Sequence, residues 1–142
     1  MINIRGFIKA NPNKKLTISV WLYAAWFRFC IRFIPMKCLR KHFGVEGEES
    51  SVEGTAEDYR YAKLISAYVN RSANNTPWES KCLVRAWTAQ RLLKKKKIPT
   101  TMYLGVKTEE GKMLAHAWLR TGSLYVTGGN GEGYATVARY RA

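Results

Sequence analysis

The spacing of hydrophobic residues changes once along the chain, near Pro99. Before this point apolar residues recur about every 3.6 positions, which is typical of helices with one buried face. After it they alternate with polar residues, which is typical of half-buried strands. The predicted helices span residues 16–34, 36–43 and 56–71, and a fourth starts at Pro77 or just after Ser80 and ends in the lysines 94–97. The predicted strands span residues 101–107, 112–120, 123–127 and 134–141.

This order of elements predicts an α+β fold, in which N-terminal helices are followed by an antiparallel meander. Segment 45–54 is rich in Glu, Ser and Gly, so we expect an exposed linker there. The glycine-rich turn before the last strand contains Asn130-Gly131, a pair typical of β-hairpins. We divide the chain into residues 1–54, a basic arm with an amphipathic helix pair and an acidic linker, and residues 55–142, the core.

The first predicted helix is long and apolar enough over residues 16–34 to resemble a membrane span. Arg28 and Arg32 argue against a span, because a charged side chain is costly at bilayer depth. Both share one helical face with Trp21 and Ala25, so the helix is amphipathic. Two interpretations stay open: the other faces pack on the core or on a partner, or the helix lies on a membrane surface with its arginines toward the lipid headgroups.

Net charge and the number of cysteines and histidines indicate what kind of partner the chain binds and which kinds of site it lacks. The 142-residue chain has 24 basic and 10 acidic residues, and its formal net charge of +14 favours an acidic partner: nucleic acid, an anionic bilayer or an acidic protein. Its 3 cysteines have no CxxC spacing and it has 2 histidines, so neither a disulfide framework nor a zinc site is expected. We therefore expect a reducing cytoplasm, no cleavable signal peptide, and no metal or other cofactor.

A cysteine follows the start signals of the fourth predicted helix. Thr76-Pro77-Trp78-Glu79 fits a capping box with proline at the first helical position, and Ser80 is an alternative cap. Either start leaves Cys82 within about two turns of the positive end of the helix dipole. Lys81 and Arg85 add positive charge nearby, and all of these groups favour a thiolate.

A histidine lies on the second predicted strand, where His116 shares one face with Trp118. Each residue alone has a plain interpretation, Cys82 as a buried structural thiol and His116 as a core side chain. Together they fit nucleophilic catalysis, with Cys82 as the nucleophile and His116 as general base and acid. The backbone N–H of Cys82 would then help to form an oxyanion hole, which Trp78 or Ser80 would line.

Five short stretches together resemble the transglutaminase-like cysteine peptidases, and one branch closely: the leader peptidase of lasso-peptide biosynthesis. The stretches are Pro77-Trp78, Cys82-Leu83-Val84-Arg85-Ala86, Ile98-Pro99, Leu104-Gly105-Val106 and Ala115-His116-Ala117-Trp118. The resemblance implies a transglutaminase/papain-like core in which Cys82 and His116 are catalytic. It also implies that a ribosomally made precursor is cleaved between leader and core, before a separate ATP-dependent cyclase closes the ring.

The chain departs from that family in one respect. Many members have an aspartate about a dozen residues after the histidine, whereas here residues 125–130 contain no acid and Asp58 is the only aspartate. Asn130 is one candidate for orienting His116, as asparagine does in papain-like sites. The alternative is a Cys–His dyad whose imidazole is held by a backbone carbonyl or by Thr127. Asn130 also has a plain interpretation as a turn residue.

The resemblance also bears on partners. In some of these systems the peptidase is fused to a small leader-binding domain, for which we expect no room in this chain. The expected partners are the precursor leader, a separate leader-recognition protein and the lasso cyclase, with a membrane surface as a further option and no nucleic acid. Two alternative functions stay open: a basic non-enzymatic module that binds nucleic acid or membrane, and a transglutaminase-like acyltransferase.

Overall fold

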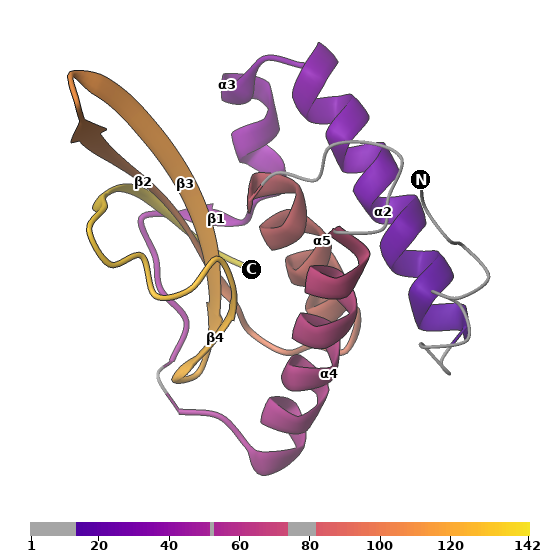
Figure 1. Ribbon diagram of the computed structural model, residues 1–142. Helices are drawn as coiled ribbons and strands as arrows, with labels where there is room; N and C mark the ends of the chain where they lie inside the picture. Colours follow the sequence, from indigo (N-terminus) through magenta and orange to yellow (C-terminus); the bar gives the residue numbers. More distant parts are fainter. Residues whose placement is uncertain (1–13, 52, 74–81) are drawn as a thin grey trace.

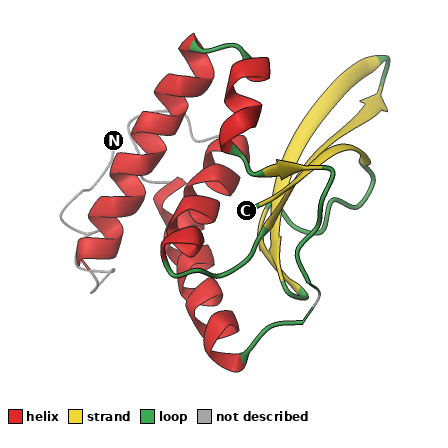
Figure 2. Cartoon of the chain, turned by 180° about the vertical axis from the view of Figure 1, so that it is seen from behind, coloured by secondary structure: helices red, strands yellow, loops and turns green. Residues whose placement is uncertain are grey.

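The computed structural model describes residues 14–51, 53–73 and 82–142, and it places helices on one side of an antiparallel sheet (Figures 1 and 2). The helices are α2 (Lys14–Phe33), α3 (Met36–Leu39), the 3₁₀ turn η1 (Arg40–His42), α4 (Ala56–Ala73) and α5 (Cys82–Lys95). The strands are β1 (Val45–Glu46), β2 (Thr101–Glu109), β3 (Lys112–Thr121), β4 (Leu124–Thr127) and β5 (Ala135–Arg141). The predicted α+β class is confirmed.

The sheet differs from the predicted meander in the position of its last strand. Its order is β1-β5-β2-β3-β4, with all neighbours antiparallel. β5 therefore pairs with β2 rather than with β4, and the predicted hairpin at Asn130-Gly131 is wrong. The glycine-rich segment 128–134 instead carries the chain from one edge of the β2–β3 pair to the other, which leaves one side of β2 free to receive β5.

Helix α5 connects the other helices to the sheet, because it contacts α2, α4 and β3. Its buried Trp87 ring stacks on Phe27 of α2 with 4.0 Å between centroids and meets the edge of Phe43 at 5.1 Å. Phe43 in turn meets Tyr140 of β5 at 5.4 Å. One face of α2 therefore belongs to the core, as the first of the two interpretations expected. Residues on both sides of the proposed boundary at residue 54 share this core.

Segment 45–54 is exposed at its described residues, as predicted, with the exception of Ser50, but it is held to the sheet. Val45 and Glu46 pair with the end of β5, and Ser50 is buried. Both the N–H and the hydroxyl of Ser50 lie 2.7 Å from Thr101 Oγ1. The polar groups of Ser50 thus have a partner on β2.

The anchor of that segment is a buried cation. Arg120 on β3 is 5% exposed and donates hydrogen bonds to the carbonyls of Ser50, at 3.0 Å, and of Gly122. Its Nε also donates to Tyr103 Oη at 3.1 Å, and that hydroxyl donates to Glu49 Oε1 at 3.0 Å. The Tyr103 hydrogen bond is the main reason that the pKa of Glu49 lies below its ordinary value.

Candidate active site

Cys82 begins α5, next to the sheet. Its side chain is half-buried, and the backbone N–H of Ala117 on β3 donates a hydrogen bond to its Sγ at 3.3 Å. The described part of α5 begins at Cys82, and the first N–H groups of a helix form its positive end. Cys30 is buried, with its pKa raised by burial, and Cys38 is exposed.

His116 precedes Ala117 on β3 and lines the same cavity as this thiol. Its Nε2 is 2.7 Å from the carbonyl oxygen of Gly128. A carbonyl oxygen only accepts hydrogen bonds, so in the neutral ring Nε2 carries the proton and Nδ1 keeps its lone pair. The ring also contacts Trp118, with centroids 5.8 Å apart, and Tyr134, at 5.0 Å. The imidazole is thus fixed by one hydrogen bond and two aromatic neighbours.

Glycines allow the loop after β4 to reach His116. Gly128 has φ +75°, and a Cβ there would lie 2.5 Å from the Ala117 carbonyl oxygen. Gly131 also has φ +75°, and a Cβ there would overlap the Trp118 indole. Only glycine combines this backbone conformation with so close an approach. The glycine cluster therefore wraps over Trp118 and brings the Gly128 carbonyl to the imidazole.

Of the two side chains that were candidates for orienting His116, one makes a contact within its own turn and the other has no hydrogen-bond partner among the described residues. Asn130 Oδ1 accepts a hydrogen bond from the N–H of Glu132 at 3.0 Å, which is a local turn contact. Thr127 is buried, and its hydroxyl has no hydrogen-bond partner among the described residues. Trp78 and Ser80, the candidates for lining an oxyanion hole, lie outside the described residues. The catalytic roles of all four stay predictions.

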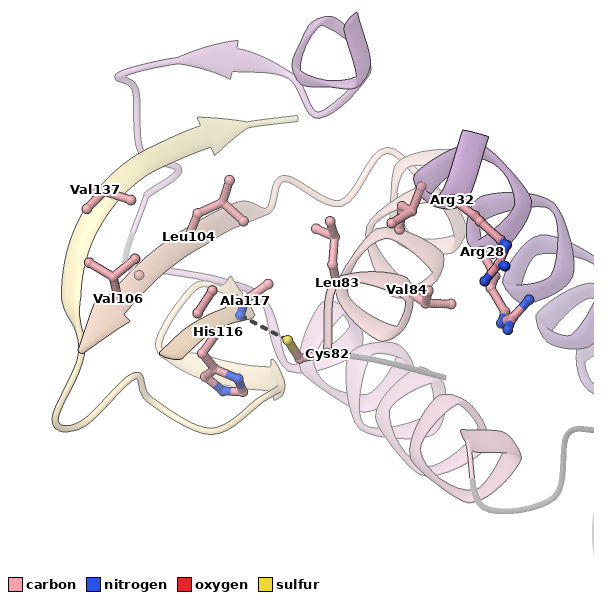
Figure 3. Close-up of a pocket in the computed structure, with 13 residues that line it drawn as sticks. Arg28, Arg32, Cys82, Leu83, Val84, Leu104, Val106, His116, Ala117 and Val137 are labelled. Atoms are coloured by element: carbon pink, nitrogen blue, oxygen red, sulfur yellow. Dashed lines mark hydrogen bonds between the residues drawn. The ribbon is translucent and has the colours of Figure 1, made fainter. Parts of the chain in front are cut away.

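Cys82 and His116 line the same cavity, of about 630 Å³, between α2, α5 and the sheet (Figure 3). Its walls are mainly apolar, and Arg28 and Arg32 of α2 lie at the end away from His116. The apolar lining residues are Ile31, Leu83, Val84, Leu104, Val106, Ala115, Ala117 and Val137. Among described residues no carboxylate lines the cavity, and no group of three His, Cys, Asp or Glu side chains could hold a metal ion. The cavity therefore suits a ligand with apolar groups, with room for a negative charge beside the arginines.

The comparison with known families agrees with this geometry. Residues 25–140 match the transglutaminase-like superfamily, a range that reaches from the middle of α2 to the end of the sheet. The chain belongs to this superfamily. Neither the curated proteins nor the solved structures contain a significant match to the chain. Membership in the transglutaminase-like superfamily indicates an activity of the cysteine-protease or acyltransferase type.

The structure selects one of the alternatives that the sequence left open, because the group that holds the imidazole is a backbone carbonyl, that of Gly128. Sequence reasoning missed two other parts of this transglutaminase-like site, the Tyr134 ring and the N–H of Ala117, which also contact the candidate pair. Every residue type carries main-chain groups, so residue identity did not indicate which carbonyl or which N–H would be used. The run of glycines after β4 was the available signal, because glycines accumulate where backbone must approach closely.

Proposed function

We propose that this chain is a cysteine peptidase that removes the leader from a lasso-peptide precursor. The observation that carries the proposal is the cavity shared by Cys82 and His116, with the thiol at a helix start and the imidazole oriented by the Gly128 carbonyl. The superfamily match supports the class of chemistry. The resemblance in the stretches around Trp78, Cys82 and His116 supports the choice of substrate.

In the proposed reaction, His116 Nδ1 takes the proton of the Cys82 thiol and the sulfur attacks the carbonyl carbon of the scissile peptide bond. The imidazolium then gives its proton to the leaving amine, which becomes the N-terminus of the core peptide. The leader stays bound to Cys82 as a thioester. Water, deprotonated by the same imidazole, hydrolyses the thioester and releases the leader acid and the free thiol.

We propose that the reaction takes place in the cytoplasm and that two other proteins act before and after it. A separate leader-recognition protein presents the precursor, and an ATP-dependent cyclase acts on the freed core. Residues 14–43 form helices, one of which packs a face into the core, so they do not themselves supply a compact β-rich module that would bind the leader.

An acyltransferase shares every step up to the thioester and differs only in the acceptor. The superfamily match favours it as the second candidate. Incubating the precursor with the enzyme and an added primary amine separates the two. A leader ending in a free acid supports the peptidase, whereas a leader ending in an amide of the added amine supports the acyltransferase.

The nucleophile is tested with purified chain, precursor and recognition protein, with products read by mass spectrometry. We expect Cys82→Ala and His116→Ala to lose cleavage by a factor of at least ~10³, because each removes a group that acts in the reaction. Cys38→Ala, at an exposed cysteine outside the cavity, serves as the matched control and should cleave normally. Cleavage by Cys82→Ala at the rate of that control would rule out the assignment.

A further inference from the structure

A row of large apolar side chains runs along the outer face of α2. Their spacing of four, four, three and four residues keeps them on one side of the helix. Trp26 stacks on Phe29 at 5.9 Å and Phe29 contacts Phe33 at 4.8 Å, so the row is continuous at its C-terminal end. We name this row the α2 stripe; its members, each 51% to 67% exposed, are Ile18, Leu22, Trp26, Phe29 and Phe33.

The α2 stripe is additional to the face of α2 that serves the core. Val20 and Phe27 are buried on the opposite side, against α5 and its Trp87. Figure 1 shows α2 on the side of the helices that faces away from the sheet. Exposed aromatic and aliphatic side chains in a continuous row indicate a surface that another body covers.

Basic side chains border the stripe. On one side a cavity of about 270 Å³ brings Trp26 together with Arg91, Lys94 and Lys95 of α5. On the other side Arg28 and Arg32 line the cavity that holds Cys82. The stretch from Lys14 to Val45 contains no Asp or Glu, so the whole border is positive. Lys94 and Lys95 at the end of α5 thus lie close to an apolar surface.

Helix α2 is long and apolar enough over Lys15–Phe33 to cross a membrane by length and composition. Crossing would pull Phe27 away from Trp87 and place Arg28 and Arg32 at bilayer depth, and both changes are costly. A helix that keeps one face in the protein and lies flat on the bilayer avoids both costs. Its 20 residues would cover about 30 Å of the surface.

We propose that the α2 stripe docks this protein onto the surface of an anionic lipid bilayer. Trp26, Phe29 and Phe33 enter the boundary between headgroups and acyl chains, while Lys94 and Lys95 meet lipid phosphates. A second copy of the chain fits less well, because two bodies of charge +14 would repel each other. Docking in this way places the cavity of Cys82 beside the membrane. Arg28 and Arg32 line that cavity and also border the α2 stripe, so the two surfaces are neighbours.

The test measures co-sedimentation of the full chain with phosphatidylcholine vesicles that contain or lack phosphatidylglycerol. We expect binding to the anionic vesicles only, weakened by salt, with a blue shift of tryptophan emission that Trp26→Phe removes. Replacing Leu22, Trp26 and Phe29 together by Ser should abolish binding. The control replaces Met113 and Tyr125, two exposed residues of the sheet, by Ser and should bind normally.

Charge is tested separately with matched pairs of lysines. Lys94→Gln with Lys95→Gln should weaken binding to anionic vesicles by roughly tenfold or more, since two bases leave the border of the stripe. Lys63→Gln with Lys112→Gln removes the same charge elsewhere and should weaken it far less. Because the lipid contacts do not involve the thiol, Cys82→Ala should bind as the unmodified chain does, whatever the outcome of the cleavage assay.

Three results would overturn the proposal. The first is absence of binding to anionic vesicles. The second is equal binding by the stripe variant and the Met113/Tyr125 control. The third is a complex, either a dimer or one with the leader-recognition protein, that needs the stripe while vesicles do not bind; this would assign the stripe to a protein partner.

Discussion

The imidazole of His116 is oriented by a main-chain carbonyl, where a related site would use an acidic or amide side chain. The Gly128 oxygen accepts from Nε2 at 2.7 Å, which leaves Nδ1 as the basic nitrogen. A carbonyl supplies the geometry without a full negative charge. We infer that the pair works as a dyad whose third group is the backbone of the glycine loop.

A substitution at Gly128 therefore tests whether the position of this carbonyl oxygen matters for activity. A Cβ at this position would lie 2.5 Å from the Ala117 carbonyl, so Gly128→Ala must move the loop and its oxygen away from His116. We expect kcat for precursor cleavage to fall about 10- to 100-fold with KM nearly unchanged, because the imidazole loses its orientation. Steady-state kinetics, with a thermal melt to show that the chain is folded, measure this.

The chain offers a matched control for that change. Gly129 has nearly the same backbone conformation, with φ +72°, but a Cβ there would meet no atom within 4 Å. Gly129→Ala thus carries the strain of a left-handed alanine without the collision. Equal loss of kcat in both variants would mean that backbone strain, and not the position of the Gly128 oxygen, limits the rate.

At this scale the sequence indicated the candidate pair by its side chains, but it did not indicate which main-chain groups would contact that pair. Cys82 and His116 could be picked out because cysteine and histidine are rare in this chain. Cys82 also follows signals for a helix start, and His116 lies on a predicted strand. Asn130 was a reasonable candidate by type, yet its amide is used within its own turn. The path of the loop after β4 decides which group reaches the His116 ring. That path depends on how the loop packs around Trp118.

Among the elements, β3 serves both function and stability. One part of it carries His116 and Ala117 at the site, and three residues further Arg120 anchors segment 48–51. The predicted strand included both parts, but its pattern did not indicate that Arg120 would be buried. Arg120 is buried because segment 48–51 folds over it, and the polar composition of that segment did not indicate a contact with the sheet. Long-range partners of this kind cannot be read from local periodicity.

Arg120→Met should lower the free energy of unfolding by about 3 kcal/mol or more. The methionine keeps much of the side-chain volume, but the buried carbonyl of Ser50 and the hydroxyl of Tyr103 lose their donor. Urea unfolding at neutral pH measures the change. Arg141→Met is the control, because its ion pair with Glu48 is largely exposed and should be worth less than about 1 kcal/mol. Equal effects of the two substitutions would show that Arg120 is not an anchor.

Over the whole molecule, periodicity predicted the α+β class, but it did not predict how charge and apolar surface are arranged. The apolar residues of α2 were visible on nearly every face of the predicted helix. Packing against Trp87 decides which face becomes core and which becomes the α2 stripe. The position of β5 was equally hidden, because the glycine-rich segment permits either a hairpin or a crossing and only the free edge of β2 selects the crossing.

The size of the cavity bears on how the proposed peptidase finds its substrate. About 630 Å³ holds only a few residues, so the site itself reads the sequence near the scissile bond and little of the leader. Recognition of the whole leader then falls to a second protein, whose binding raises the local concentration of the cleavage site. We expect kcat/KM for the full precursor to rise roughly 100-fold or more when the leader-recognition protein is added.

A short peptide that spans only the cleavage site is the control for this effect. It lacks the leader, so the recognition protein cannot tether it, and its cleavage should be slow and indifferent to that protein. Rates are followed by chromatography at substrate concentrations well below KM. If the precursor alone is cut as fast as the precursor with its recognition protein, the chain selects the leader itself. The surface that binds the leader would then lie on this chain. Arg28 and Arg32, at the end of the cavity away from His116, would be the first residues to replace.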